Sequence, residues 1–291
     1  MPTRWTKRLP AACRLFALFS LLFLLSSCSS MLTTGFIEPT VANMQRQTDL
    51  DLACQGSPAY LLMIDSLIAA DPEDPDLLRT GCQAYSGYLA ALPECGADAD
   101  RVRTVAEKGH RYGTTLLAQS LPVAPGDDLN ALARALAGLR TSQLPDIYWG
   151  TVAWLGWIQA EQGAPAAMAD LVRVEKIMAR LLQLDEGYQR GSIHLFFGAY
   201  YATRPPMLGG DPEKSAYHFQ RALKLSQHRM LLVQTTYAET LARQLFDQDL
   251  YNRLLNEVLA FPLADAPDIA LANQIAKHRA GRLIAEDYFS Q

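Results

Sequence analysis

Apolar residues recur at helical spacing along most of the chain. Leu61, Ile64 and Ile68 follow one another at spacings of three and four residues, and similar stripes occur at 102–116, 171–181 and 250–259. This spacing places the apolar side chains on one face of a helix, whose other faces are more polar. Alternation of polar and apolar residues over a useful length is missing, so the pattern does not predict strands.

Proline and glycine residues separate these stripes at regular distances. They occur at Ser57-Pro58, 71–75, Pro93, 122–125, Pro145, 163–165, 205–206, 209–212 and Pro262. The pattern predicts about a dozen helices of about 12 to 22 residues joined by short turns. The Asp-Pro pairs that begin at Asp71, Asp74 and Asp211 predict helix N-caps followed by proline in the first turn. The expected fold is all-α, an array of antiparallel helical hairpins.

Two segments have the pattern of tetratricopeptide (TPR) repeats. These repeats pair two helices per 34 residues, with small residues where the helices cross. Residues 61–90 contain Ala70, an Asp-Pro turn and Ala84, and residues 191–226 contain Gly198 and Ala222. Because the two connections differ in length, the repeats are expected to be degenerate and TPR-like.

The N-terminus has the layout of a secretory signal. Four basic residues precede the apolar run Leu15–Leu25, which is too short to span a membrane. The run ends in Leu25-Ser26-Ser27-Cys28, which resembles a bacterial lipobox. We predict a lipoprotein signal peptide at 1–27, lipid attachment at Cys28, a tether at 28–39 and a single TPR-like domain at 40–291.

The alternative interpretation of this segment is an ordinary signal peptide or a stray cysteine. If Cys28 is lipidated in a Gram-negative host, the absence of Asp at the second mature position resembles sorting to the outer membrane, facing the periplasm. The net charge of −4 becomes −8 once the four basic leader residues are removed. Such a surface argues against nucleic-acid binding, so membrane attachment is expected to depend on the acyl chains.

Three cysteines remain in the predicted mature domain. Cys54, Cys82 and Cys95 allow one disulfide and one free thiol, and their spacing does not select the pair. Their separation also matches no zinc-binding pattern.

The sequence predicts neither an enzyme nor a cofactor or metal site. The five histidines are far apart, and no nucleophile elbow, phosphate loop or His-Glu-Xaa-Xaa-His stretch occurs. His194 lies in an apolar helix and is interpreted as a core or pocket-lining residue.

Aromatic residues are concentrated in two segments. One contains Tyr148, Trp149 and Trp154, and the other contains Tyr200 and Tyr201. A helix that is apolar on all sides is normally buried. The alternative is that one face lines an apolar cavity, where Trp and Tyr contribute both area and a polar tip.

Residues 196–259 resemble the TatT component family of TRAP-transporter-associated lipoproteins. The matching residues are Gly198, Tyr200, Tyr201, Pro206, Gly209, Gly210, 214–216, Phe219, Ala222, Leu223, 237–239, Asp249, Leu254 and Leu255. With weaker marks upstream, the resemblance extends over residues 40–287. The Gly209-Gly210 segment and the helix after it are its most specific part.

The resemblance implies a periplasmic lipoprotein that binds the solute-binding protein of a tripartite ATP-independent periplasmic (TRAP) transporter. It also implies a ring-like homotrimer and an internal cavity or pore that passes a hydrophobic small ligand to the partner. The candidate cavity residues are Tyr148, Trp149, Trp154, Tyr200, Tyr201 and Met207. The alternative function is an envelope scaffold that binds peptide segments of other proteins, since a helical-repeat fold does not separate the two.

Overall fold

A computed structural model describes residues 38–124 and 127–290. Within these ranges the chain forms twelve α-helices and no strand. The predicted signal peptide and Cys28 lie outside the described residues. The chain divides between Met44 and Gln45 into two units. Helix α3 (Glu38–Gln45) spans this division and begins one residue before the predicted end of the tether.

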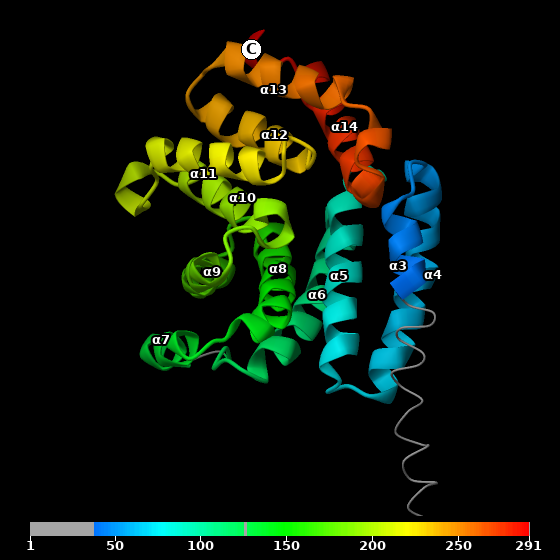
Figure 1. Cartoon of the computed structure of the whole chain (residues 1–291), viewed down its shortest axis with the longest axis vertical. Helices are drawn as coiled ribbons and strands as arrows, with labels where there is room; N and C mark the ends of the chain where they lie inside the picture. The colour runs from blue at the N-terminus through cyan, green and yellow to red at the C-terminus, as the bar shows by residue number, and fades with distance from the viewer. Residues whose placement is uncertain (1–37, 125–126, 291) are drawn as a thin grey trace, which may run out of the picture. The chain divides into compact units, whose positions relative to one another are not determined.

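The second unit contains the remaining helices, which follow one another with short turns (Figure 1). Their bounds are α4 Leu50–Ala70, α5 Pro75–Ala91, α6 Ala99–Ala118, α7 Leu129–Ala137, α8 Leu144–Ala160, α9 Pro165–Leu184, α10 Tyr188–Ala202, α11 Pro212–Leu225, α12 Leu232–Tyr237, α13 Gln248–Ala260 and α14 Ala270–Ala285. Helix α12 continues into a π-helical turn, η4, at Ala238–Ala242. Several 3-10 turns, including η3 (Pro206–Leu208) and η6 (Pro267–Ile269), lie between the helices.

Helices that are neighbours in sequence are mostly neighbours in space. Helix α5 packs on α4 and α6, α8 packs on α6 and α9, α10 packs on α11, and α13 packs on α14. The last helix, α14, also contacts α4 and α5, so the second unit closes on itself (Figure 1). The prediction of an all-α array of helical hairpins is therefore confirmed. The TPR-like repeat stays a prediction.

The apolar stripes form the core as their spacing indicates. Leu61, Ile64 and Ile68 are all buried on α4, and Val174, Met178 and Leu181 are buried on α9. Two large hydrophobic clusters result, one built mainly by α7–α10 and the other by α11–α14. Helix α4 is long and apolar enough to cross a membrane by length and composition alone, but its buried stripe packs on α5.

Two of the three predicted Asp-Pro caps are correct. The Asp74 side chain accepts from the backbone N–H groups of residues 76 and 77, and the Asp211 side chain accepts from the N–H of Lys214. Asp71 instead follows the end of α4, where its own N–H donates to the carbonyl of Leu67. The turn from residue 71 to residue 74 is too short to contain a helix, so only its second aspartate caps one.

The predicted break at Ser57-Pro58 is wrong, because Pro58 lies inside α4. The helix continues on both sides of it because Leu50, Leu61 and Ile64 are buried along one face, and this packing outweighs the hydrogen bond that proline removes. Helices α7 and α12 are also shorter than predicted, with 9 and 6 residues.

One disulfide fastens the first hairpin of the second unit. Cys54 on α4 pairs with Cys95 in the turn after α5, with 5.8 Å between their Cα atoms. Cys82 remains a buried free thiol, and burial raises its pKa to about 12. The structure thus selects one of the three pairings that the sequence left open.

Candidate functional site

The aromatic residues of α8 begin with a buried tyrosine that faces α10. The Tyr148 hydroxyl donates to Ser192 Oγ over 2.7 Å, and burial raises the pKa of Tyr148 to about 12. The rings of Trp149 and Tyr188 each meet the Tyr148 ring edge-on, with centroids 5.1 Å away. Trp149 and Tyr188 are only partly buried and therefore form the accessible part of this group.

Trp154 belongs to a second group, between α6, α8 and α9. Its ring is almost completely buried, and Nε1 donates to Asp170 Oδ2 over 3.2 Å. The His110 ring stacks on Trp157 at 4.4 Å and lies 6.0 Å from Trp154. Burial lowers the pKa of His110, so its imidazole is neutral at pH 7 and acts as a flat packing surface.

Tyr200 and Tyr201 form a third group near the end of α10. The Arg204 guanidinium lies 3.9 Å from the centroid of Tyr200, which is cation–π geometry. Tyr201 stacks on His218 of α11 at 5.7 Å. Both tyrosines are partly buried, so this group also presents aromatic area to solvent.

The six predicted cavity residues do not form a single contact group in the structure. Tyr148 and Trp154 are buried members of one hydrophobic cluster, and Trp149, Tyr200 and Tyr201 pack against its edge. Met207 on η3 is 89% exposed and lies outside that cluster. The core interpretation therefore applies to Tyr148 and Trp154, while a ligand cavity beside the others stays a prediction.

The family-motif residues shape the α10–α11 hairpin. Gly209 has φ +88°, and a Cβ on Gly210 would lie 1.9 Å from the carbonyl oxygen of Arg204, so both positions need glycine. Phe219 is fully buried and stacks on Tyr237 at 4.6 Å. Pro206 begins η3, and Ala222 is buried in the same cluster as Phe219. These residues set backbone geometry and packing.

A polar network on the same hairpin brings together histidines that are 24 residues apart. Nδ1 of His194 lies 2.9 Å from Nδ1 of His218, and Nε2 of His194 lies 3.2 Å from the Glu186 carboxylate. Arg221 binds both oxygens of the Glu186 carboxylate: Nε donates over 3.0 Å to Oε2, the oxygen that also faces His194, and Nη2 donates to Oε1. Sequence reasoning treated these histidines as unrelated, because only the register of α10 against α11 makes them neighbours.

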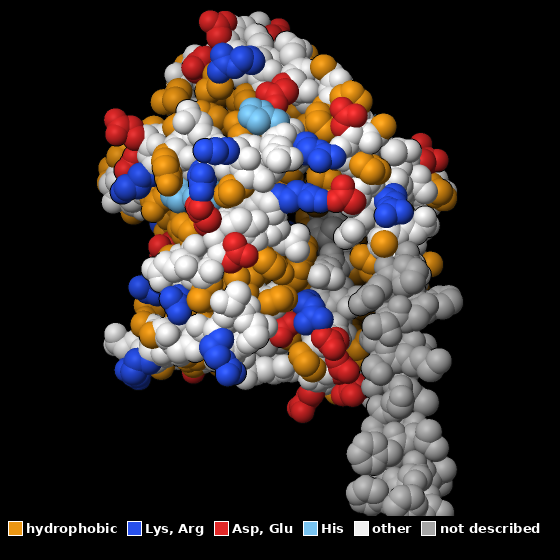
Figure 2. All heavy atoms as spheres, in the orientation of Figure 1, with side chains coloured by type: hydrophobic (Ala, Val, Ile, Leu, Met, Phe, Trp, Pro, Cys, Tyr) orange, Lys and Arg blue, Asp and Glu red, His pale blue; other side chains and the backbone are white. Residues whose placement is uncertain are grey.

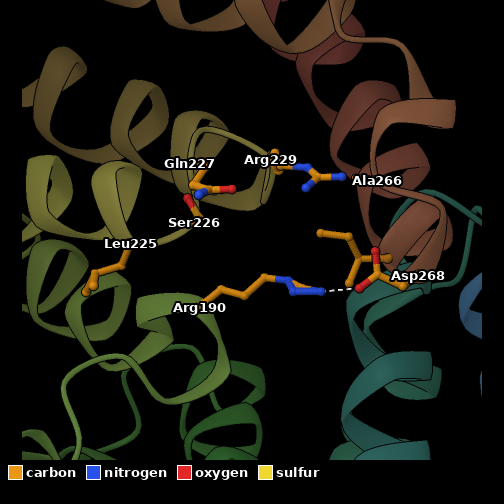
Figure 3. Close-up of a pocket in the computed structure, with 8 residues that line it drawn as sticks. Arg190, Leu225, Ser226, Gln227, Arg229, Ala266 and Asp268 are labelled. Carbon is orange, nitrogen blue, oxygen red and sulfur yellow. Dashed lines mark hydrogen bonds and ion pairs between the residues drawn. The ribbon is translucent and has the colours of Figure 1, made fainter.

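A small pocket that sequence reasoning also missed lies among α10, α11 and η6. It has a volume of about 140 Å³ and is lined by Arg190, 225–227, Arg229, Ala266, Asp268 and Ile269 (Figure 3). Arg190 extends across it to form an ion pair with Asp268, and the Arg229 guanidinium donates to the main-chain oxygen of Asp265. No spacing rule could have found these residues, which come from three separate turns.

A wider and more open groove of about 470 Å³ lies between α7 and α9. Its lining includes Ala133, Leu136 and Ala179 together with the charged residues Glu175, Lys176 and Arg180. In the part of the chain that the structure describes, no group of three or more His, Cys, Asp or Glu side chains is placed to hold a metal ion. On the face shown in Figure 2, basic and acidic side chains are intermingled.

Comparison with known families identifies the closed helical unit. The model of the TRAP transporter T-component family matches residues 46–289, which is nearly all of that unit. The chain belongs to the TRAP transporter T-component family. The resemblance predicted from the Gly209-Gly210 segment is thus confirmed. The T-component family is a family of transporter components and is not a known enzyme family.

One relative of this T-component is an uncharacterised protein of Treponema pallidum (strain Nichols). It is 26% identical over 267 residues, and the alignment covers 84% of this chain and 81% of the relative. The similarity therefore extends over most of both proteins.

Proposed function

We propose that this T-component is a non-enzymatic subunit that binds the solute-binding protein of a TRAP transporter and passes an apolar ligand to it. The observation that supports this most is that two groups of partly buried aromatic side chains, Trp149 with Tyr188 and Tyr200 with Tyr201, pack against the same hydrophobic cluster. Burying apolar surface against such side chains contributes about 25 cal/mol of binding free energy per Å². The polar tips of Trp and Tyr can orient the ligand. Family membership supplies the transporter context.

The proposal includes attachment to the cell envelope. A lipid on Cys28 would hold the chain at the outer membrane, facing the periplasm, as the leader pattern predicts. The Cys54–Cys95 disulfide is consistent with such a compartment, because disulfides persist where the environment is oxidising. Assembly as a homotrimer belongs to the same proposal and is checked by the mass of the purified protein.

The proposal is tested with the full chain purified in detergent. Native mass spectrometry identifies small molecules that remain bound, and biolayer interferometry measures binding of a TRAP solute-binding protein from the same organism. We expect a stoichiometric apolar ligand that is lost in Tyr201→Ala. Tyr288→Ala, at a partly exposed tyrosine in the C-terminal 3-10 turn, is the matched control and should retain the ligand.

The two measurements separate the proposed function from the scaffold alternative. The scaffold alternative would be supported if the purified protein carried no ligand and did not bind the solute-binding protein, but bound peptide segments of envelope proteins. Partner binding without a ligand would keep the transporter role and remove ligand passage.

A further inference from the structure

The small pocket among α10, α11 and η6 carries more positive than negative charge. Two guanidinium groups, those of Arg190 and Arg229, face a single carboxylate, that of Asp268 (Figure 3). We propose that this pocket is a binding site for a small organic monocarboxylate. It shares no lining residue with either group of aromatic side chains, and the proposal does not depend on the proposed function.

The charges favour an anion with a single negative charge. Arg190 pairs with Asp268, and the charge of Arg229 acts on the same carboxylate, so both cations lower the pKa of Asp268 and keep it ionised. One positive charge remains uncompensated by the lining residues. A carboxylate bound between Arg229 and Arg190 would neutralise it, and guanidinium groups match carboxylate oxygens in geometry. A dianion such as phosphate would leave a negative excess.

The volume limits the size of the ligand. Ligand pockets for drug-sized molecules have volumes of about 300–1,000 Å³, whereas this pocket has about 140 Å³. At about 30 Å³ per water molecule, that space holds roughly five heavy atoms. The Ser226 hydroxyl donates to the carbonyl of Leu223 and is therefore not available to a ligand. Among the lining side chains, the amide of Gln227 is the neutral group that can donate a hydrogen bond to a ligand.

The backbone around the pocket has an uncommon conformation. Arg190 has φ +59° and Gln227 has φ +53°, and their neighbours Gln189 and His228 are also at positive φ. Non-glycine residues rarely adopt this conformation, and such positions cluster at ligand-binding sites. Here the two left-handed turns place side chains from α10 and from the end of α11 on facing sides of one pocket (Figure 3).

The test uses the full chain in detergent and propionate, which has five heavy atoms, as the probe. Ligand-observed NMR titration measures its dissociation constant, with propionamide as the uncharged isostere and phosphate as the dianion. We expect propionate to bind, propionamide not to bind, and phosphate to bind more weakly than propionate. Arg229→Gln should weaken propionate binding about tenfold or more, since it removes a charge-assisted contact.

Asp268→Asn should change the propionate affinity in the opposite direction to Arg229→Gln. Because a damaged pocket would only weaken binding, this variant distinguishes the proposal from partial unfolding. Removing the competing carboxylate should tighten propionate binding severalfold and improve phosphate binding more, whereas a merely damaged pocket would weaken both. Arg103→Gln, on the exposed side of α6, is the matched control and should change nothing. The proposal is overturned if wild type does not bind propionate, if propionamide binds equally, or if Asp268→Asn weakens binding.

Discussion

Close approach of α10 and α11 depends on a glycine. A Cβ on Gly198 would lie 2.8–2.9 Å from ring carbons of Phe219, closer than real contacts allow. Phe219 cannot move aside easily, because it is fully buried and its ring stacks on Tyr237 at 4.6 Å. Ser215 adds to the same contact, since its buried hydroxyl donates to the carbonyl oxygen of Gly198 over 2.7 Å.

Gly198→Ala should therefore destabilise the protein by about 1–3 kcal/mol, the usual cost of inserting a methyl group into a packed contact. Gly56→Ala is the matched control, because no atom lies within 4 Å of its added Cβ and the position is exposed inside α4. There alanine should stabilise by about 0.5–1 kcal/mol through helix propensity. Urea denaturation measures both, and equal signs for the two variants would contradict this account.

Sequence patterns predicted residue roles where the role is local. The caps at Asp74 and Asp211 and the buried stripe of α4 follow from spacing alone. Met207 shows where such prediction ends, since an apolar side chain in a turn carries no periodicity that tells whether it is buried or, as here, 89% exposed. The lining of the charged pocket was equally out of reach, because Arg190 and Asp268 are 78 residues apart.

The α10–α11 hairpin carries a pH-sensitive network. Burial, and then repulsion from His194, lower the pKa of His218 to about 4, and burial also lowers the pKa of His194. Hydrogen bonds from Arg221, and then from His194, lower the pKa of Glu186 to about 2. In the folded protein the imidazoles are therefore neutral at pH 7 and the carboxylate is ionised.

Stability should fall as the pH falls from about 6.5 towards 4, because the unfolded histidines, with a pKa of about 6.5, bind protons that the folded ones resist. Below about pH 4.5 the loss of the Glu186 contribution adds to this fall. His218→Gln should reduce the slope of unfolding free energy between pH 7 and 5. His278→Gln, at an exposed histidine on α14, is the control, and urea titrations at each pH measure both. If the slope of unfolding free energy against pH were unchanged in His218→Gln, His218 would not be a source of the pH dependence.

At the scale of elements, the sequence predicted that helices form but not always where they end. Pro58 marked a break that packing of α4 overrides, and η4 interrupts a helix with a π turn that carries no marker residue. The pairing of His194 with His218 required the register of two helices, which the composition of neither helix determines.

The whole second unit is closed by a contact between its first hairpin and its last helix. Arg282 on α14 donates to Glu94 in the turn after α5 over 2.9 Å, across 188 residues of sequence. Glu94 lies next to the disulfide-bonded Cys95, so the covalent link and the ion pair fasten the same turn. This closure makes the helical array a ring-like unit, and helical periodicity alone predicts an open array equally well.

Removing Arg282 from its ion pair with Glu94 should cost more stability than removing the charge of Glu94. The Glu94 side chain is 7% exposed, whereas the Arg282 side chain is 45% exposed and also pairs with Glu286 at 2.9 Å. Arg282→Met would leave a buried carboxylate without its cation and should cost about 3 kcal/mol. Glu94→Gln would leave Arg282 with Glu286 and solvent, and should cost less than about 1 kcal/mol.

The double variant and local exchange decide whether the pair closes the array. If the Glu94 carboxylate destabilises the fold only when it lacks its cation, adding Glu94→Gln to Arg282→Met should restore most of the lost free energy of unfolding. Hydrogen exchange in Arg282→Met should rise in α14 and in the turn at residues 92–98, while α8 and α9 keep their protection. Equal costs for the two single variants, or exchange that rises throughout the unit, would show that closure depends on the other contacts of α14 with α4 and α5 instead of on this ion pair.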